Sequence, residues 1–131
     1  MLKGLHHVGI AAANIEDAVR LHTGPLSGSL MRRGELNGIE FALIDSGGVE
    51  LELLRNGDPE SAIGKFVAER GGGIHHLAFA VDDIHAEVAR LVGEGFQQSG
   101  EVRMGVHGVP IVFFHPKSAG GVLTELVEVH G

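Results

Sequence analysis

The sequence lacks several residue types, and each absence narrows what the protein can be. It contains no cysteine, which excludes disulfides, iron–sulfur clusters and thiolate-bound metals. It contains no tryptophan or tyrosine to act as a platform on which nucleic-acid bases could stack. Basic residues are scarce, ten against seventeen acidic ones, and the formal net charge of −7 opposes non-specific attraction to phosphate backbones. We therefore expect no nucleic-acid partner.

The sequence also has no long apolar run. No stretch approaches the roughly 20 apolar residues that a membrane helix requires. The first residues, Met1-Leu2-Lys3-Gly4, lead straight into a strand-like segment without the pattern of a signal peptide. With 131 residues, the chain has the size of one domain and can bury most of its apolar surface without cross-links. We therefore expect a single soluble, cytoplasmic domain, residues 1–131, without a membrane partner.

What the sequence does contain is an internal duplication. The run His6-His7-Val8-Gly9-Ile10-Ala11 recurs 69 residues later as His75-His76-Leu77-Ala78-Phe79-Ala80. Each copy ends in an apolar strand with an acid at its centre, Val49–Leu54 in the first copy and Val122–Val127 in the second. The chain therefore consists of two related modules, at about residues 1–56 and 74–131, joined by a linker helix at about 57–73.

Both modules are expected to follow the order βαβββ, which makes the chain an α+β protein. The first strand of each module leads into a helix, with Asn14 as the cap of Ile15–His22 in one module. In the other, Asp82 or Asp83 caps a helix that runs to about Val92. Glycine-containing turns separate the strands, which are placed near Leu5–Ala11, Ser29–Arg32, Ile39–Ile44, Val49–Leu54, Ile74–Val81, Phe96–Gln98, Val109–Phe114 and Val122–Val129, with the linker helix over Pro59–Arg70.

Strand alternation selects one histidine from each His-His pair. Successive side chains of a strand point to opposite faces, so Val8 and Ile10 share the face that packs under a helix. His7 lies on the other face beside Gly9, and His76 lies in the same way beside two alanines. Small neighbours leave room for a ligand next to each imidazole. Four further histidines, in helices, a loop or the tail, are expected to be solvated: His22, His85, His107 and His130.

The duplicated acids are Glu52 and Glu125. Glu50 and Glu52 point to the same face of their strand, but only Glu52 aligns with an acid in the second module. A glutamate at the centre of an apolar strand is costly to bury unless it is ionised and paired or bound to a metal. Two imidazoles and two carboxylates make a complete ligand set for one divalent ion, here His7, Glu52, His76 and Glu125.

These motifs resemble the vicinal oxygen chelate superfamily, whose glyoxalase-like fold curves two tandem βαβββ modules into an eight-stranded mixed sheet around one metal site. The resemblance is strongest with its methylmalonyl-CoA epimerase branch and covers most of the chain. Beyond the His-His and glutamate motifs, it rests on the linker Asp58–Phe66 and on the tail, where Phe114-His115-Pro116-Lys117-Ser118 leads into Gly120–Leu126.

The resemblance implies His7, Glu52, His76 and Glu125 as the ligands of one divalent metal ion per chain. Glutamine stands at the position of Glu52 in some relatives. The ion implied is octahedral and keeps two waters, which suits Co²⁺, Ni²⁺, Mn²⁺ or Mg²⁺ and also allows Zn²⁺. The reaction implied interconverts the C2 epimers of methylmalonyl-CoA by proton abstraction through a metal-stabilised enolate. The partners implied are a small-molecule acyl-CoA substrate and a second copy of the chain in a homodimer.

The resemblance also raises the question of which groups carry the proton. Glu125 is a candidate for both ligand and proton carrier. Many members of the branch have a base glutamate three residues after the glycine that opens the third strand. Aligned on Gly38, that position is Phe41, and the nearby acid is Glu40. An offset of one residue turns a side chain to the other face, so Glu40 is a candidate base only if a bulge restores its direction.

Basic side chains are candidates for binding the anionic groups of the substrate. Lys117, in the His-Pro-Lys turn, could neutralise a substrate carboxylate or a CoA phosphate, or could be an ordinary solvated turn lysine. Three arginines could serve the phosphates as well, although no spacing selects among them: Arg32, Arg33 and Arg103.

Three other functions share the same fold. A glyoxalase I-type lactoylglutathione lyase would use the same four ligands, but the linker and tail favour the epimerase branch. An iron-dependent extradiol dioxygenase uses two histidines and one glutamate, so a fourth ligand at Glu52 disfavours it. A non-enzymatic binding protein of the bleomycin-resistance type dispenses with the metal, and the intact ligand set argues against that function.

Overall fold

Eight strands and three α-helices make up the part of the chain that the computed structural model describes, residues 1–130. The chain divides into a first unit, residues 7–75, and a second unit, residues 1–6 with 76–131. The first unit holds most of β1 (Gly4–Ala11), then α1 (Ile15–Thr23), β2 (Ser29–Leu36), β3 (Ile39–Ser46), β4 (Val49–Asn56) and α2 (Ala62–Arg70). The second unit holds most of β5 (Gly73–Val81), then α3 (Ile84–Gly93), β6 (Gln98–Met104), β7 (Pro110–Phe114), the short 3₁₀ helix η1 (Pro116–Ser118) and β8 (Thr124–Glu128).

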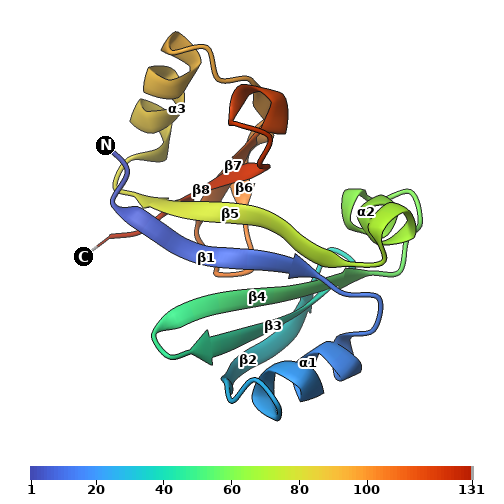
Figure 1. Ribbon diagram of the computed structural model, residues 1–131. Helices are drawn as coiled ribbons and strands as arrows, with labels where there is room; N and C mark the ends of the chain where they lie inside the picture. The colour runs from blue at the N-terminus through green and yellow to red at the C-terminus, as the bar shows by residue number, and fades with distance from the viewer. Residues whose placement is uncertain (131) are drawn as a thin grey trace. The chain divides into compact units, whose positions relative to one another are not determined.

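Both units have the same strand order, which confirms the duplicated βαβββ plan and the α+β class. In the first unit the order is β2-β3-β4-β1, and in the second it is β6-β7-β8-β5 (Figure 1). The opening strand pairs in parallel with the closing strand of its own module, β1 with β4 and β5 with β8. The other pairs are antiparallel, so the eight-stranded sheet is mixed, as expected. A parallel pair needs a long crossover connection, and the helix and two intervening strands provide it.

The helix of the first module covers one face of its sheet. Asn14 caps α1 as expected, because its side-chain oxygen accepts a hydrogen bond from the backbone N–H of Asp17 at 3.0 Å. The apolar stripe of α1 then packs on β3 and β4. The buried residues of this core are Ile15, Ala42, Ile44 and Leu53, with Ile10 packed against them. Ile10 therefore points to the helix side, as the alternation of β1 predicts.

The second module repeats this layer with α3 on β7 and β8. Its core is larger and contains Val81, Ile84, Leu91, Val112, Phe114 and Leu126, with Phe79 at its margin. Of the two aspartates expected as caps, Asp83 takes the role and accepts a hydrogen bond from the N–H of Ala86 at 3.1 Å. Asp82 instead forms an ion pair with Lys3 at 2.8 Å.

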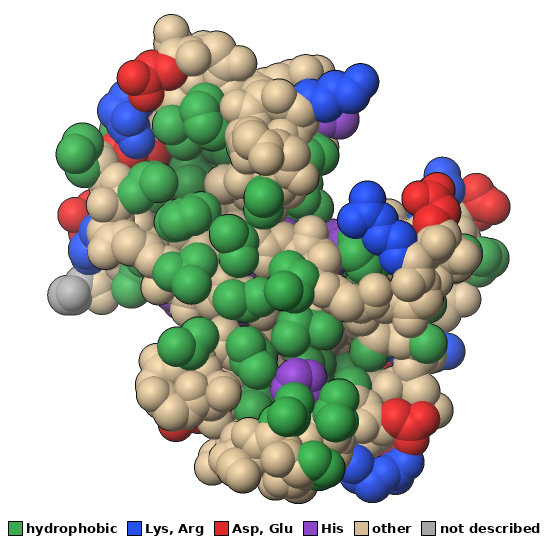
Figure 2. All heavy atoms as spheres, in the orientation of Figure 1, with side chains coloured by type: hydrophobic (Ala, Val, Ile, Leu, Met, Phe, Trp, Pro, Cys, Tyr) green, Lys and Arg blue, Asp and Glu red, His purple; other side chains and the backbone are tan. Residues whose placement is uncertain are grey.

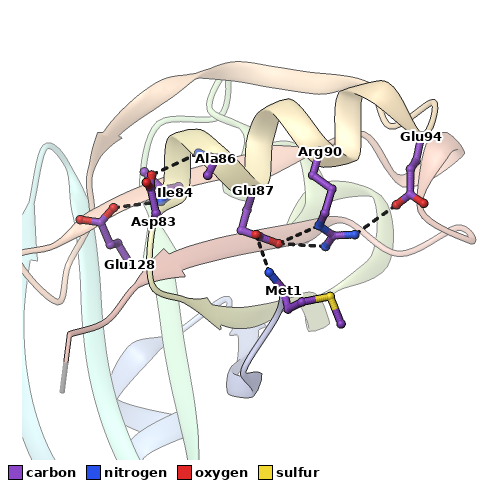
Figure 3. A network of polar contacts seen from close by, with 8 residues as sticks. All are labelled: Met1, Asp83, Ile84, Ala86, Glu87, Arg90, Glu94 and Glu128. Carbon is purple, nitrogen blue, oxygen red and sulfur yellow. Dashed lines mark hydrogen bonds and ion pairs between the residues drawn. The ribbon is translucent and has the colours of Figure 1, made fainter.

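Two carboxylates lie at the first turn of α3 and make several polar contacts (Figure 3). The side chain of Glu128, from β8, accepts a hydrogen bond from the first helical N–H, that of Ile84, at 3.0 Å. Buried Glu87 contacts the N-terminal ammonium of Met1 at 2.6 Å and the guanidinium of Arg90 at 2.9 Å. These contacts lower the pKa of Glu128 through the Ile84 N–H and the pKa of Glu87 through the ammonium.

Several element boundaries differ from those expected. The β2 strand continues to Leu36, and β6 starts at Gln98 and runs to Met104. The linker helix begins at Ala62, because Ser61 is its cap and accepts a hydrogen bond from the N–H of Gly64 at 2.9 Å. The closing strand of the second module, Thr124–Glu128, is shorter than expected.

The surface carries both charged and apolar side chains. Figure 2 shows apolar side chains exposed among charged and other polar groups on the face drawn. Large apolar residues that are at least half exposed include Leu5, Leu26, Met31, Ile74 and Met104. None of the helices within residues 1–130 combines the length and the apolar character needed to cross a bilayer.

Candidate metal centre

In the first unit, the parallel pairing of β1 and β4 places His7 and Glu52 on the same face. Gly9 is the pairing partner of Glu52, and His7 lies two residues before Gly9, so all three share one side of the sheet. Nε2 of His7 lies 3.5 Å from Oε1 of Glu52. The two residues are 0% and 4% exposed. Strand alternation therefore predicted the face of both side chains correctly.

The second unit builds the same pair in the same register. Ala78 is the pairing partner of Glu125, and His76 lies two residues before Ala78. Nε2 of His76 lies 3.0 Å from Oε1 of Glu125. His76 is 1% exposed and Glu125 is 3% exposed. Gly9 and Ala78, the small residues expected beside the histidines, are also buried.

The donor types fit a divalent metal. Each pair offers one imidazole nitrogen and one carboxylate oxygen. These are donor atoms that could hold a metal ion. A buried ionised carboxylate is costly unless a cation or strong hydrogen bonds compensate it. Two carboxylates and two neutral imidazoles balance a charge of +2, and nitrogen and oxygen donors without thiolate suit the first-row divalent ions and Mg²⁺.

The neighbouring histidines have other contacts. The ring of His75 meets the ring of Phe66 edge to face, with centroids 5.0 Å apart. The rings of His6 and His107 meet in the same way at 4.9 Å. His107, which was expected in a solvated loop, is therefore half-buried against another side chain.

Glu40 lies on the opposite face of its sheet from Glu52. In the antiparallel pairing of β3 and β4, Leu43 is the partner of Glu52 and Glu40 is the partner of Arg55. The pairing of β3 shows no bulge near Glu40. Its carboxylate instead contacts the guanidinium of Arg55 at 2.6 Å. Glu40 and Arg55 line a shallow hollow at the start of α1 with Ala13, Asn14, Ile15 and Glu16.

The His-Pro-Lys turn is well anchored, and Lys117 is exposed. The hydroxyl of Ser118 donates to the carbonyl of His115 at 2.9 Å and accepts from the backbone N–H of Gln97 at 2.9 Å. This fixes the backbone of η1, which carries Lys117 on its surface. The hydrogen bonds of Ser118 hold the turn that carries Lys117. Lys117 itself does not contact the His76–Glu125 pair.

Sequence reasoning missed the role of Phe113. It is the antiparallel partner of Glu125, and its ring meets the ring of His76 edge to face at 5.3 Å. The guanidinium carbon of Arg103 lies 5.2 Å from the centre of the same ring. Counting back across the Gly120-Gly121 turn from Glu125 could have placed Phe113 approximately, but not Arg103, because the β6–β7 pairing is irregular between Ser99 and Arg103.

Comparison with known families agrees with this geometry. Residues 6–113 match the family described as the Glyoxalase/Bleomycin resistance protein/Dioxygenase superfamily. The glyoxalase-like fold and the two buried His–Glu pairs therefore define the chain as a member of that superfamily.

Individual relatives narrow the assignment. The mitochondrial methylmalonyl-CoA epimerase of Homo sapiens is 35% identical over 128 residues, which cover 95% of this chain and 73% of the human protein. The ethylmalonyl-CoA/methylmalonyl-CoA epimerase of Cereibacter sphaeroides is 34% identical and covers 98% of this chain and 100% of its own length. The crystal structure of methylmalonyl-CoA epimerase from Mycobacterium tuberculosis has a TM-score of 0.91 and 37% identity, with 99% of this chain and 90% of that chain covered. The chain belongs to the methylmalonyl-CoA epimerase family.

Proposed function

We propose that this protein interconverts the two C2 epimers of methylmalonyl-CoA. The observation that carries the proposal is the presence of two buried His–Glu pairs, in matched register, in a chain that resembles these epimerases over almost its whole length. A related epimerase, 31% identical with a TM-score of 0.91, has been crystallised with methylmalonyl-CoA and NH4+.

His7, Glu52, His76 and Glu125 would together hold one divalent ion per chain. The duplication supports a shared ion, because each module supplies half of a four-ligand set and neither half alone satisfies a metal that prefers six donors. Co²⁺, Ni²⁺, Mn²⁺ and Mg²⁺ suit this donor set, and Zn²⁺ is also compatible with it. When bound, such an ion supplies Lewis acidity toward the oxygens of the substrate.

The residues of the chain would hold the substrate and move its proton. Epimerisation breaks the C2–H bond, leaves the electron pair delocalised onto the thioester oxygen, and returns a proton to the other face of C2. Glu125 is proposed to take this proton on a carboxylate oxygen, because it is buried beside His76 on the sheet face that also carries Ala78. The burial of the pair excludes water, which strengthens electrostatic interactions with the developing negative charge.

The position of Glu40 does not support a role for it as the opposite base. Its carboxylate lies on the helix side of β3 and is paired with Arg55, whereas Glu52 faces the other side. Lys117 remains a proposed contact for an anionic group of the substrate, because η1 holds it exposed and close in sequence to β8.

The relatives also indicate which acyl groups to test as substrates and which other functions of this fold are disfavoured. The name of the Cereibacter sphaeroides relative includes ethylmalonyl-CoA, so we propose that an ethyl branch at C2 is a second substrate to test. The same relatives weigh against a lactoylglutathione lyase, a dioxygenase or a metal-free binding protein. A cytoplasmic location and a homodimer stay predictions, and the exposed apolar side chains such as Ile74 are compatible with a partner surface.

The test is proton NMR of methylmalonyl-CoA in D₂O, with protein stripped of metal and then reloaded with Co²⁺. We expect the C2 proton signal to disappear only with the reloaded protein, and the His76→Ala and Glu125→Ala variants to leave it intact. The same experiment with ethylmalonyl-CoA measures the range of acyl groups, and with a glutathione hemithioacetal it tests the lyase. The proposal would be refuted by a protein that binds one metal per chain but exchanges the C2 proton of neither methylmalonyl-CoA nor ethylmalonyl-CoA.

A further inference from the structure

One arginine stands apart from most others in the chain. Four arginines are held by carboxylates: Arg20 by Asp17, Arg33 by Glu16, Arg55 by Glu40, and Arg90 by Glu87 and Glu94. Arg103 is exposed, and no carboxylate within residues 1–130 lies at ion-pair distance from it. Its guanidinium instead stacks on the ring of Phe113 and donates one hydrogen bond from Nη1 to the carbonyl of Glu101 at 3.2 Å.

Arg103 and the His76–Glu125 pair lie on the same face of the strands of the second unit. Arg103 is the pairing partner of Ile111, which lies two residues before Phe113 and points to the same side. Phe113 is in turn the partner of Glu125. Ala78, Ile111 and Val127 form an apolar cluster with Phe113 on this face, separate from the core under α3.

The ring of Phe113 contacts both His76 and Arg103. The His76 ring meets it at 5.3 Å between centroids with an interplanar angle of 89°, and the Arg103 guanidinium carbon lies 5.2 Å from the same centroid. The guanidinium is therefore one aromatic ring away from the imidazole of the catalytic pair. The two other stacked arginines lie on different rings, Arg32 on Phe41 and Arg70 on Phe66.

Stacking leaves this cation prepared to bind an anion. The planar guanidinium has several N–H donors in a fixed arrangement that matches carboxylate or phosphate oxygens in pairs. Stacking on an aromatic face restricts its rotation without using up the donors at its edge. An arginine already paired with a glutamate would have to give up that contact before it could bind a substrate, and Arg103 does not.

We propose that Arg103 binds an anionic oxygen group of the acyl-CoA substrate and positions its C2 at the His76–Glu125 pair. This rests on the proposed function. Two groups of the substrate have the required chemistry, the acyl carboxylate and the phosphates of CoA. The short path through Phe113 favours the carboxylate, because it is attached to C2 itself.

The experiment measures binding at equilibrium as well as activity. Malonyl-CoA, which has the carboxylate, and acetyl-CoA, which has the phosphates alone, are titrated calorimetrically into Co²⁺-loaded wild-type protein and into Arg103→Met and Arg103→Lys variants. Arg70→Met is the matched control, since Arg70 is likewise exposed and lies 5.0 Å from the ring centre of Phe66 in α2. Circular dichroism melts establish that each variant is folded.

We expect Arg103→Met to weaken malonyl-CoA about tenfold or more, Arg103→Lys to recover part of that loss, and Arg70→Met to match the wild type. Unchanged acetyl-CoA binding in Arg103→Met assigns the carboxylate as the bound group, and an equal loss for both esters assigns a phosphate. A folded Arg103→Met protein that binds both esters as well as wild type overturns the proposal. C2 proton exchange by the wild type is recorded in parallel, and its absence would instead overturn the proposed function.

Discussion

The strand beside the ligand glutamate carries a different residue in the two units. In the first unit, Leu43 is the antiparallel partner of Glu52, and in the second, Phe113 is the partner of Glu125. The pairs differ in closeness as well, 3.5 Å between the nitrogen and oxygen atoms in the first unit and 3.0 Å in the second. Duplication has kept the register of the two His–Glu pairs, while the residue beside each glutamate has diverged.

A second difference concerns the arginines. Each unit has one stacked on a phenylalanine of the same sheet face, Arg32 on Phe41 and Arg103 on Phe113, both at 5.2 Å. In the second unit that phenylalanine also meets the ring of a histidine, His76, edge to face. A substrate with a thioester at one end and a carboxylate at the other is itself asymmetric. Under the proposed function, the shared His–Glu pairs would hold the metal, and the residues that differ between the modules would recognise the substrate.

The largest effect should come from replacing the two glutamates by glutamine. Glutamine keeps an oxygen that can coordinate a metal, but it cannot take up a proton. We expect Glu52→Gln to retain activity within about tenfold, and Glu125→Gln to lose about a thousandfold or more, in the upper range of general acid–base contributions. The rate of C2 proton exchange measures both. Equal losses of activity in the two variants would show that Glu52 and Glu125 do not differ in proton transfer.

Removal of the metal should destabilise both units together. An ion at a thousand times its dissociation constant stabilises the folded state by about 4 kcal/mol, because it binds the folded chain and not the unfolded one. We expect the Tm to fall by roughly 10 °C or more after chelation, and to return when Co²⁺ is added. A calorimetric scan checks this. If the Tm did not move, the buried carboxylates would have to be compensated without an ion.

Phe113→Leu makes the second unit resemble the first at the residue beside the glutamate. The guanidinium of Arg103 would lose its stacking ring, and we expect KM for methylmalonyl-CoA to rise about threefold to tenfold. The reverse change, Leu43→Phe, places an aromatic ring in the buried core of the first unit and should lower stability by about 1–3 kcal/mol. Steady-state kinetics and urea unfolding separate the two effects. An unchanged KM in Phe113→Leu would show that the Phe113 ring does not contribute to substrate recognition.

The smallest effect concerns the contact between Glu128 and the start of α3. The Ile84 N–H lowers the pKa of Glu128 below its ordinary value of 4.5, so its stabilisation is present above that pH and is lost as the pH falls through the lowered native pKa. We expect Glu128→Gln to cost about 1 kcal/mol at pH 7, as loss of a helix cap does, and less at pH 3. Glu69→Gln, on the exposed surface of α2, is the control. A difference that stayed constant with pH would contradict the charged contact.

The duplication made the module order and the shared face of each His–Glu pair predictable from the sequence. Alternation alone gave the faces of His7 and His76, and the repeat separated Glu52 from Glu50, since a strand has only two faces to choose between. It also anticipated that Glu40 could point away from the ligands, as the pairing of β3 shows. These features depend on local geometry, so they can be read along the chain.

Features that depend on pairing between distant strands could not be read in this way. Because the register is irregular between Ser99 and Arg103, neither the start of β6 nor the position of Arg103 could be predicted from the sequence. The contact of Phe113 with His76 needs the order β5-β8-β7, which no local pattern reveals. The role of Ser61 as a cap was masked by Pro59, a residue that often stands in the first turn of a helix.

If both His–Glu pairs bind the same ion, as proposed, the metal stoichiometry tests this most directly. Co²⁺ is titrated into metal-free wild-type protein and into His7→Ala and His76→Ala variants, and bound metal is quantified by calorimetry and elemental analysis. We predict one ion per chain in the wild type, and an affinity at least about a hundredfold lower in either variant, as loss of any one ligand would cause. Two ions per chain, or a variant that keeps one tightly bound ion, would contradict a shared centre.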